Sequence, residues 1–259
     1  KKHINKFEFN SWFMHTMRPP RVEELYSDGP HLASYAFEIG NPRLKAEKIY
    51  GIENAIKYKS SPFNFSLVTF FNYSPYFFEM TKNGFCDDKD WVLGTSHPCA
   101  GQDFIDWGSG VFGWLYKYSA KGNEVILRGY EFDFDYYINN YHVKYNYSLV
   151  RGDNITINKP LSYINPIKQI LSLGYKNKST YYKIRISKIN SQNRLGEFET
   201  PTAGVYLTDI IINLNFNRHN FTIQLNNIFD NLYYNHLSRI KSLTPEPGKN
   251  IHFIYKIVF

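Results

Sequence analysis

The sequence contains little sulfur and no long apolar run. Two of its 259 residues are cysteine and three are methionine. No stretch approaches the roughly eighteen consecutive apolar residues that a membrane-spanning helix needs, and the mean hydropathy is negative. The chain is therefore either soluble or crosses a membrane as β-strands, because only helices and closed barrels span a bilayer.

Motifs for catalysis and for nucleic-acid binding are also missing. We find no G-x-S-x-G, H-E-x-x-H or phosphate-binding loop, and Ser109 is interpreted as a turn residue. The net charge is +7, but lysine and arginine are scattered over strand ends and turns. We therefore expect neither an enzyme nor a nucleic-acid-binding protein. An anionic outer leaflet or an anionic ligand explains the positive charge equally well.

No signal peptide opens the chain, because residues 1–10 already have the pattern of a strand. An exported protein with this start would lack its N-terminus. We therefore expect the chain to be a piece of a longer protein.

Aromatic residues and period-two alternation dominate what is present. Tyrosine (22) and phenylalanine (21) together outnumber lysine plus arginine (30), as expected of a barrel with aromatic girdles. Near the C-terminus, Phe221, Ile223 and Leu225 share one strand face, and the residues between them are polar. A second alternating stretch ends on Phe259. These patterns predict strands with one apolar face and one polar face that suits a water-filled lumen.

Three blocks in the last forty residues resemble the closing hairpin of TonB-dependent outer-membrane receptors. They are Asn226-Asn227-Ile228-Phe229-Asp230, Tyr233-Tyr234-Asn235-His236-Leu237-Ser238 and Pro245-Glu246-Pro247-Gly248-Lys249-Asn250. Family members more often have arginine where Lys249 stands. The resemblance implies that Phe259 is part of the signal read by the barrel-assembly machinery.

A second resemblance to the same family lies near the N-terminus, after a first strand over residues 5–17 that we expect to slip in register near Ser11. It consists of Arg18-Pro19-Pro20, Glu23-Glu24-Leu25-Tyr26, Gly29-Pro30-His31, Phe37-Glu38-Ile39-Gly40-Asn41-Pro42 and Leu44-Lys45-Ala46-Glu47. Residues 21–26 are predicted to form a short helix in an external loop. The Gly-Pro-His version is most similar to the zinc-uptake branch of the family.

The alternation predicts about eleven strands in an all-β, antiparallel transmembrane β-barrel. After the first strand, the remaining expected strands cover residues 44–58, 64–78, 110–119, 123–136, 141–151, 165–176, 180–189, 203–217 and the two C-terminal stretches, with a hairpin turn at 120–123. Short and long connections alternate, as in barrels with short periplasmic turns. The resemblance implies a 22-stranded barrel with a plugged lumen. Residues 1–259 would then form its C-terminal half, without the plug and the N-terminal half.

Candidate metal ligands gather in the long connection 79–109. Cys86 and Cys99 are predicted to form a disulfide, as expected for two cysteines in an exported loop; a metal–thiolate site is the alternative. Asp87, Asp88 and His97 offer carboxylate and imidazole ligands that suit zinc, against the alternative of a solvated acidic loop. His31 is a further candidate ligand, from the Gly-Pro-His segment.

Three carboxylates, Glu131, Asp133 and Asp135, fall on one predicted inward face. They could guide a cation along the lumen. The alternative is that they pair with basic groups, for which His142 and Lys144 on the next strand are candidates.

The resemblance implies a receptor for TonB-dependent active uptake in the outer membrane of a Gram-negative cell. Its expected ligand is a metal ion or metal complex, with zinc leading and siderophore, haem or cobalamin behind. Expected partners are the TonB energy-transducing complex acting through the plug, outer-membrane lipid and the barrel-assembly machinery; no cofactor is expected. A passive porin-type channel and a soluble, β-rich carbohydrate-binding module are the alternatives.

Overall fold

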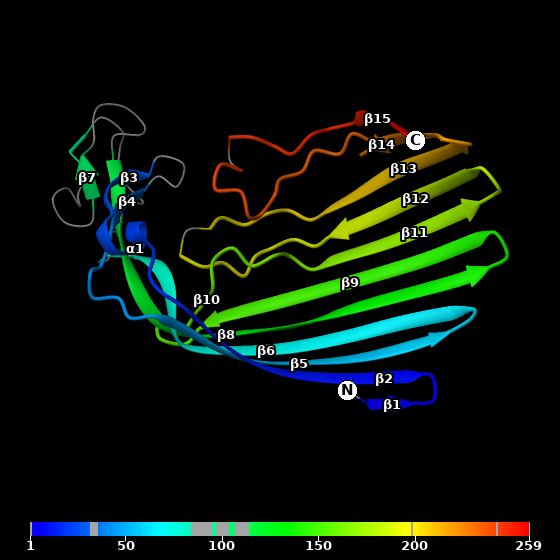
Figure 1. The fold of residues 1–259 in the computed structure, drawn as a ribbon. Helices are drawn as coiled ribbons and strands as arrows, with labels where there is room; N and C mark the ends of the chain where they lie inside the picture. Colours follow the sequence, from blue (N-terminus) through cyan, green and yellow to red (C-terminus); the bar gives the residue numbers. More distant parts are fainter. Residues whose placement is uncertain are drawn as a thin grey trace.

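One curved antiparallel sheet makes up most of the molecule (Figure 1). The computed structural model describes residues 2–31, 36–83, 95–96, 104–106, 114–197, 199–241 and 243–258. The main path through the sheet follows chain order. Its strands are β1 (Lys2–Ile4), β2 (Phe7–Arg18), β5 (Glu47–Ser60), β6 (Phe63–Lys82), β8 (Trp114–Ile138), β9 (Tyr141–Asn154), β11 (Lys168–Lys176), β12 (Thr180–Ile189), β13 (Val205–Phe216), β14 (His219–Asn226) and β15 (Asn250–Ile257). The predicted all-β, antiparallel fold is confirmed.

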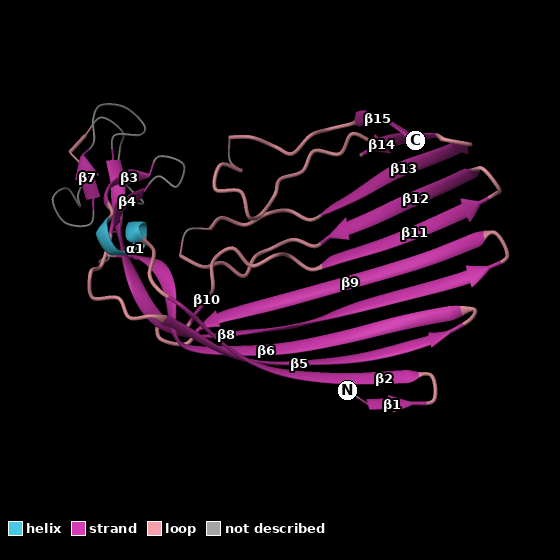
Figure 2. Cartoon of the chain, in the orientation of Figure 1, coloured by secondary structure: helices cyan, strands magenta, loops and turns pink. Residues whose placement is uncertain are grey.

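The remaining elements belong to the long connections at one end of the sheet (Figure 2). They are α1 (Val22–Tyr26), β3 (Asp28–His31), β4 (Ala36–Ile39), β7 (Phe104–Asp106) and β10 (Lys159–Pro160). β4 pairs in parallel with β8 at residues 116–119. Ala36, Phe37, Leu115 and Tyr118 are buried there, so this end holds the most enclosed apolar packing described.

Connections differ sharply between the two ends of the sheet. Two-residue turns join β1 to β2, β5 to β6, β8 to β9 and β13 to β14. Asn5, Asn139 and Asn217 open three of these turns with φ of 53°, 50° and 51°, a conformation that asparagine tolerates better than most residues. The opposite end has the long connections, as predicted for external loops. We call the two ends the short-turn end and the long-connection end.

The predicted hairpin turn at residues 120–123 is wrong. β8 runs through these residues without a break, pairing Ala120 with Met80 and Asn123 with Phe77. A Cβ atom on Gly122 would fall 2.1–2.4 Å from ring carbons of Tyr76. Gly122 therefore makes room for an aromatic ring on the neighbouring strand. The expected count of about eleven strands still holds, because β8 replaces two predicted strands and the short β1 adds one.

The register slip expected near Ser11 is also wrong. β2 pairs with β5 in one continuous register from Phe7–Tyr58 to Arg18–Glu47. Trp12 and Met14 therefore share the concave, inward face of the sheet with Asn10. Phe13 lies on the convex, outward face and is 82% exposed. The inward face of β2 is thus less polar than those of the later strands.

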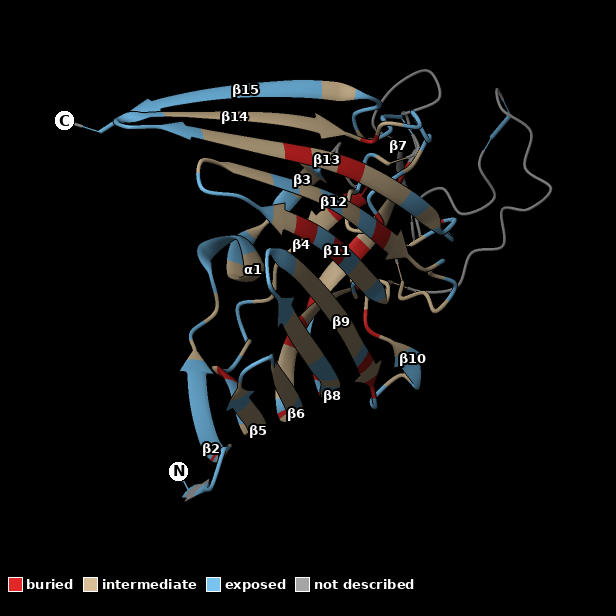
Figure 3. Cartoon of the chain, turned by 90° about the vertical axis from the view of Figure 1, so that its right-hand side faces the viewer, coloured by how far each residue is buried: buried red, intermediate tan, exposed pale blue. Residues whose placement is uncertain are grey.

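Aromatic side chains form a continuous row across the outward face of five strands. Phe7 packs against Tyr58 with ring centroids 4.8 Å apart, and Tyr58 against Phe65 at 5.6 Å. Phe65, Phe132 and Tyr145 extend the row at 6.4 Å each. β15 is exposed along almost its whole length (Figure 3). Apolar side chains on an exposed convex surface are what a lipid-facing wall requires.

The short predicted helix is present as α1, and Arg18 holds it against the sheet. The Arg18 guanidinium contacts both oxygens of Glu24 at 3.0 Å and Oε2 of Glu47 at 3.2 Å. Glu47 is buried and also accepts the backbone N–H of Phe78. One arginine therefore joins α1 to the edge where β2, β5 and β6 meet. Within the described residues, no helix has the length and apolar character needed to span a membrane.

Candidate functional site

Polar groups pair with one another along the inward face of β8 and β9. Asp135 lies 2.9 Å from Nε2 of His142, and Asp133 accepts a hydrogen bond from the Asn146 amide. Lys144 stands opposite Asp135 in the strand register. The structure thus confirms His142 as a partner of the carboxylate stripe. Asp133 and Asp135, two of the three carboxylates on this face of β8, contact side chains of β9. This favours the interpretation that the carboxylates pair with neighbouring residues over the interpretation that they guide cations along the lumen.

A second inward ion pair links β12 to β13. Nε of Arg185 donates to Asp209 at 2.8 Å, and the backbone N–H of Asn227 donates to the other carboxylate oxygen at 2.9 Å. Asp209 is 7% exposed. This pair fixes the start of the connection after β14 to the wall of the sheet.

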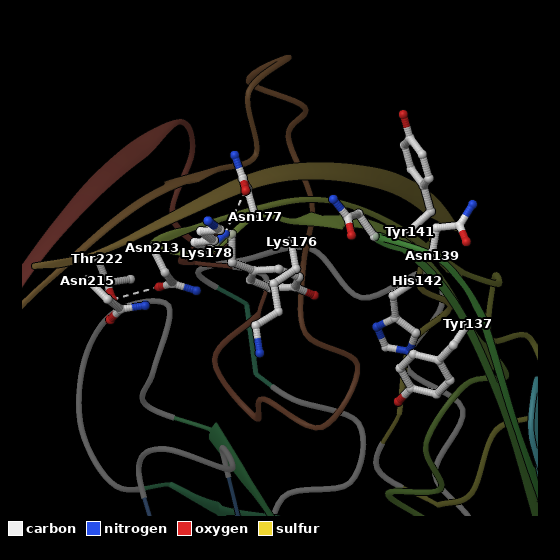
Figure 4. Close-up of a pocket in the computed structure, with 12 residues that line it drawn as sticks. Tyr137, Asn139, Tyr141, His142, Lys176, Asn177, Lys178, Asn213, Asn215 and Thr222 are labelled. Atoms are coloured by element: carbon white, nitrogen blue, oxygen red, sulfur yellow. Dashed lines mark hydrogen bonds between the residues drawn. The ribbon is translucent and has the colours of Figure 1, made fainter.

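A pocket of about 860 Å³ opens on the concave face at the short-turn end (Figure 4). Six strands, from β8 to β14, contribute to it. Tyr137 stacks on His142 with centroids 4.3 Å apart, and Thr222 donates to Asn213 at 2.7 Å. The remaining lining residues are Asn139, Asn140, Tyr141, Lys176, Asn177, Lys178, Tyr181 and Asn215. Amides, phenols, an imidazole and two lysines suit a polar occupant held by hydrogen bonds.

At the long-connection end, a buried polar cluster joins three connections. Nε2 of His236 lies 3.0 Å from Oε1 of Glu199, and the two side chains are 0% and 2% exposed. Glu199 also accepts the backbone N–H groups of Tyr163, at 2.5 Å, and Gly196, at 2.8 Å. The connections after β9, β12 and β14 therefore meet at one carboxylate. We call Glu199, His236, Thr202 and Lys241 the loop cluster.

The hydrogen bonds of the loop cluster fix the protonation of His236. Nζ of Lys241 lies 2.7 Å from Thr202 Oγ1, and a lysine can only donate. Nζ of Lys241 also lies 3.5 Å from Nδ1 of His236, so Nδ1 faces a group that can only donate, and the Thr202 hydroxyl, 2.9 Å from Nδ1, is free to donate to it as well. Nδ1 is thus an acceptor, and the neutral imidazole carries its proton on Nε2, beside Glu199. Burial lowers the pKa of His236; nearby Glu199 opposes the shift and Lys241 adds to it.

Acidification is expected to loosen the loop cluster. In the opened connections His236 has its ordinary pKa of about 6.5, whereas burial lowers the pKa in the closed form. The open form therefore binds protons more readily, and stability is lost as the pH falls below about 6.5. Hydrogen exchange at the Tyr163 and Gly196 amides, corrected for the intrinsic rate, should show weaker protection at pH 5 than at pH 7.5. Equal protection at both values, or an equal change in His236→Gln, would contradict this assignment.

The first long connection reaches the same region through Glu38 of β4. Glu38 Oε1 lies 2.7 Å from Nδ1 of His31 and 3.7 Å from Arg239, in the connection after β14. The Arg239 guanidinium lies over the ring of Tyr163, 5.1 Å from its centroid. Side chains far apart in sequence therefore link the first and last long connections.

The predicted metal ligands are only partly placed by the structure. His31 lies at the end of β3, paired with Glu38. His97, Asp87, Asp88, Cys86, Cys99 and Phe259 lie outside the described residues. In the described part of the chain, no group of three or more His, Cys, Asp or Glu side chains is arranged to hold a metal ion. Sequence reasoning missed Glu199, Thr202 and Lys241, because no local pattern marks residues that meet only through long connections.

Comparison with known proteins gives one family and one fold. Residues 13–229 match the family model described as TonB dependent receptor-like, beta-barrel. The copper transporter OprC superposes with a TM-score of 0.77 at 16% identity, over 97% of this chain and 37% of that one. The siderophore receptor PirA from Acinetobacter baumannii gives 0.69 at 13%, over 100% and 40%. The FrpB iron transporter from Neisseria meningitidis (F3-3 variant) gives 0.67 at 15%, over 99% and 36%. The chain therefore spans well under half the length of these structures, and identity this low shows the shared fold.

Proposed function

Because this chain belongs to the TonB-dependent receptor-like β-barrel family, we propose that it is part of a receptor that takes up a metal ion or metal complex across the outer membrane. The match over residues 13–229 carries the proposal. Two features of the fold support it: the outward aromatic row and the short turns confined to one end. Proteins of this family are outer-membrane transporters and not enzymes.

The coupling of uptake to TonB, through a plug in the lumen, is part of the proposal. The inward face of β8 to β14 presents paired charges and amides, which suit contact with water and with a polar protein segment. Barrel-assembly machinery reading Phe259 and contact with outer-membrane lipid complete the proposed partners.

Zinc is the ligand that we propose first. OprC, FrpB and PirA are described as a copper transporter, an iron transporter and a siderophore receptor, which supports metal uptake in general. The specific support for zinc is chemical. Glu38 contacts His31 at 2.7 Å, and a carboxylate partner of this kind commonly orients a histidine that binds metal. Asp87, Asp88 and His97 would supply the other ligands, held by a Cys86–Cys99 disulfide.

Zinc binding by the full-length protein tests this choice of ligand. Calorimetry in detergent should show binding at micromolar zinc, and His97→Ala and His31→Ala should each weaken it by about tenfold or more, because losing even a residue that only orients a ligand costs about 10–100-fold. His219→Ala is the matched control, because His219 lies at the opposite, short-turn end of β14. Zinc binding absent at micromolar concentration, or unchanged in both variants, would overturn zinc. The same titration with copper or a ferric siderophore would then identify the cargo.

A further inference from the structure

A basic hollow lies at the long-connection end of β8 and β9. Its volume is about 320 Å³, and its charged lining consists of Arg128, Asp153, Lys159 and Arg194. A second hollow of about 140 Å³ shares Arg194 and is also lined by Arg151. The two hollows together form one patch, which we call the rim patch.

The strand register places the rim patch where the lipid-facing wall ends, on the side of the long-connection end. Outward pairs along β8 and β9 run from Ile138–Tyr141 through Phe132–Tyr147 to Tyr130–Leu149, and the next outward pair is Arg128–Arg151. The apolar run from Ile138 to Tyr130 covers about 27 Å of strand, or about 20 Å along the membrane normal at the usual tilt. The arginine pair therefore comes where the apolar band gives way to headgroups.

An aromatic pair next to the two arginines, on their short-turn side, supports this position. Tyr130 stacks on Tyr147 with centroids 5.3 Å apart and ring planes 5° apart. Tyrosines concentrate at the border between hydrocarbon and headgroups, where the ring is buried and the hydroxyl reaches polar groups. Arg128 and Arg151 stand one and two outward positions beyond this pair.

The charges of the rim patch are only partly neutralised internally. Arg194 donates to the carbonyl of Gly152 at 2.9 Å and contacts Asp153. Arg128 has a long contact of 3.7 Å with Asp153, and its side chain is 58% exposed. Lys159 pairs with Glu197 but is 54% exposed. With Arg151, the rim patch thus has four cations, and they face two carboxylates, Asp153 and Glu197. The exposed guanidinium of Arg128 retains donors suited to an anion.

We propose that the rim patch binds the phosphate group of an anionic lipid in the outer leaflet. Arginine donors arranged as a fork match phosphate oxygens, and the outward register directs them to the bilayer border. Arg194, held by Gly152 and Asp153, forms the fixed side of the site, and Arg128 supplies the exposed donors. This site is independent of the transported cargo.

Native mass spectrometry of the full-length protein in detergent tests the proposal, with lipid A as the anionic probe and phosphatidylethanolamine as the zwitterionic one. Arg128→Gln/Lys159→Gln should raise the Kd for lipid A by about tenfold, the scale of a lost charge-assisted hydrogen bond. Binding of phosphatidylethanolamine should not change. Arg128→Gln alone should give a smaller rise, and it provides the test if the double variant does not fold.

The matched control is Lys6→Gln/Arg218→Gln, which removes the same charge at exposed positions of the short-turn end. It should leave the lipid A affinity at the wild-type value. Wild-type affinity in the Arg128 variants, or an equal loss in the control, would overturn the site. Displacement of lipid A by millimolar inorganic phosphate would show that free phosphate is the ligand and would overturn the lipid assignment. Persistence of lipid A binding under those conditions supports it.

Discussion

Glu199→Ala is expected to release three long connections at once. Glu199 is the shared acceptor for the Tyr163 and Gly196 amides and contacts His236, and its side chain is 2% exposed. Removing it leaves two amides without their acceptor and a buried imidazole without the carboxylate that lies 3.0 Å from its Nε2. Each such loss costs roughly 1.5–3 kcal/mol. We therefore expect the Tyr163 and Gly196 amides to exchange hydrogen about 10 to 100 times faster.

Tyr163 makes this effect larger. Its backbone has φ of +60°, a conformation that costs a non-glycine residue about 1–3 kcal/mol and persists only when neighbours hold it. The Glu199 carboxylate is one of these neighbours, 2.5 Å from the Tyr163 nitrogen. Without it, the connection after β9 is free to relax.

Two variants control for other effects of the change. Glu199→Gln keeps one carbonyl oxygen and should give an intermediate exchange rate. Glu246→Ala removes a carboxylate from the connection after β14 that is not the acceptor of either amide, and it should leave their exchange unchanged. Wild-type protection of both amides in Glu199→Ala would show that the loop cluster does not hold the connections together.

Arg18→Ala is expected to lower the stability of the folded protein by roughly 2–4 kcal/mol, somewhat less than the loss of a fully buried ion pair, because the Arg18 side chain is 35% exposed. The Glu47 side chain is 8% exposed and would lose its cationic partner while keeping its contact with the Phe78 amide. Glu24 would also lose the contact that holds α1 to the sheet. The measurement is the temperature at which the full-length protein loses its folded mobility on a detergent gel.

Arg18→Lys keeps the charge but not the paired contacts with Glu24, so it should fall between alanine and wild type. Arg43 is exposed and lies in the connection from β2 to β5, which also contains α1. The Arg43→Ala variant should therefore unfold at the wild-type temperature. The role assigned to Arg18 is contradicted if Arg18→Ala also unfolds at that temperature.

Sequence reasoning succeeded where the determinant is local. The alternation of Tyr130, Phe132 and Phe134 with Glu131, Asp133 and Asp135 assigns two faces to β8, because side chains of a strand alternate at period two. The structure confirms these faces and the pairing of Asp135 with His142. The helix at α1 was predictable from another local signal, the acidic residues Glu23 and Glu24 in its first turn. The two kinds of connection follow from the spacing between the alternating stretches.

It failed where the determinant lies on another part of the chain. Local signals predict a turn at residues 120–123, whereas the ring of Tyr76 on β6 requires a glycine at position 122 of a continuous strand. Glu199, Thr202 and His236 lie in two connections with no common periodicity, and only the folded sheet brings them together. The arginine pair at Arg128–Arg151 depends on the register between two strands, which composition does not reveal.

Accumulation of radiolabelled zinc by cells that express the full-length protein tests the proposed function most directly. Parallel cultures with radiolabelled copper and a ferric siderophore cover the other metal cargoes. Each measurement is made with and without a functional TonB. We expect at least one of these metals to accumulate above its external concentration, and this accumulation to disappear without TonB. Entry that only equilibrates with the medium, at the same rate without TonB, would contradict active uptake and identify a passive channel.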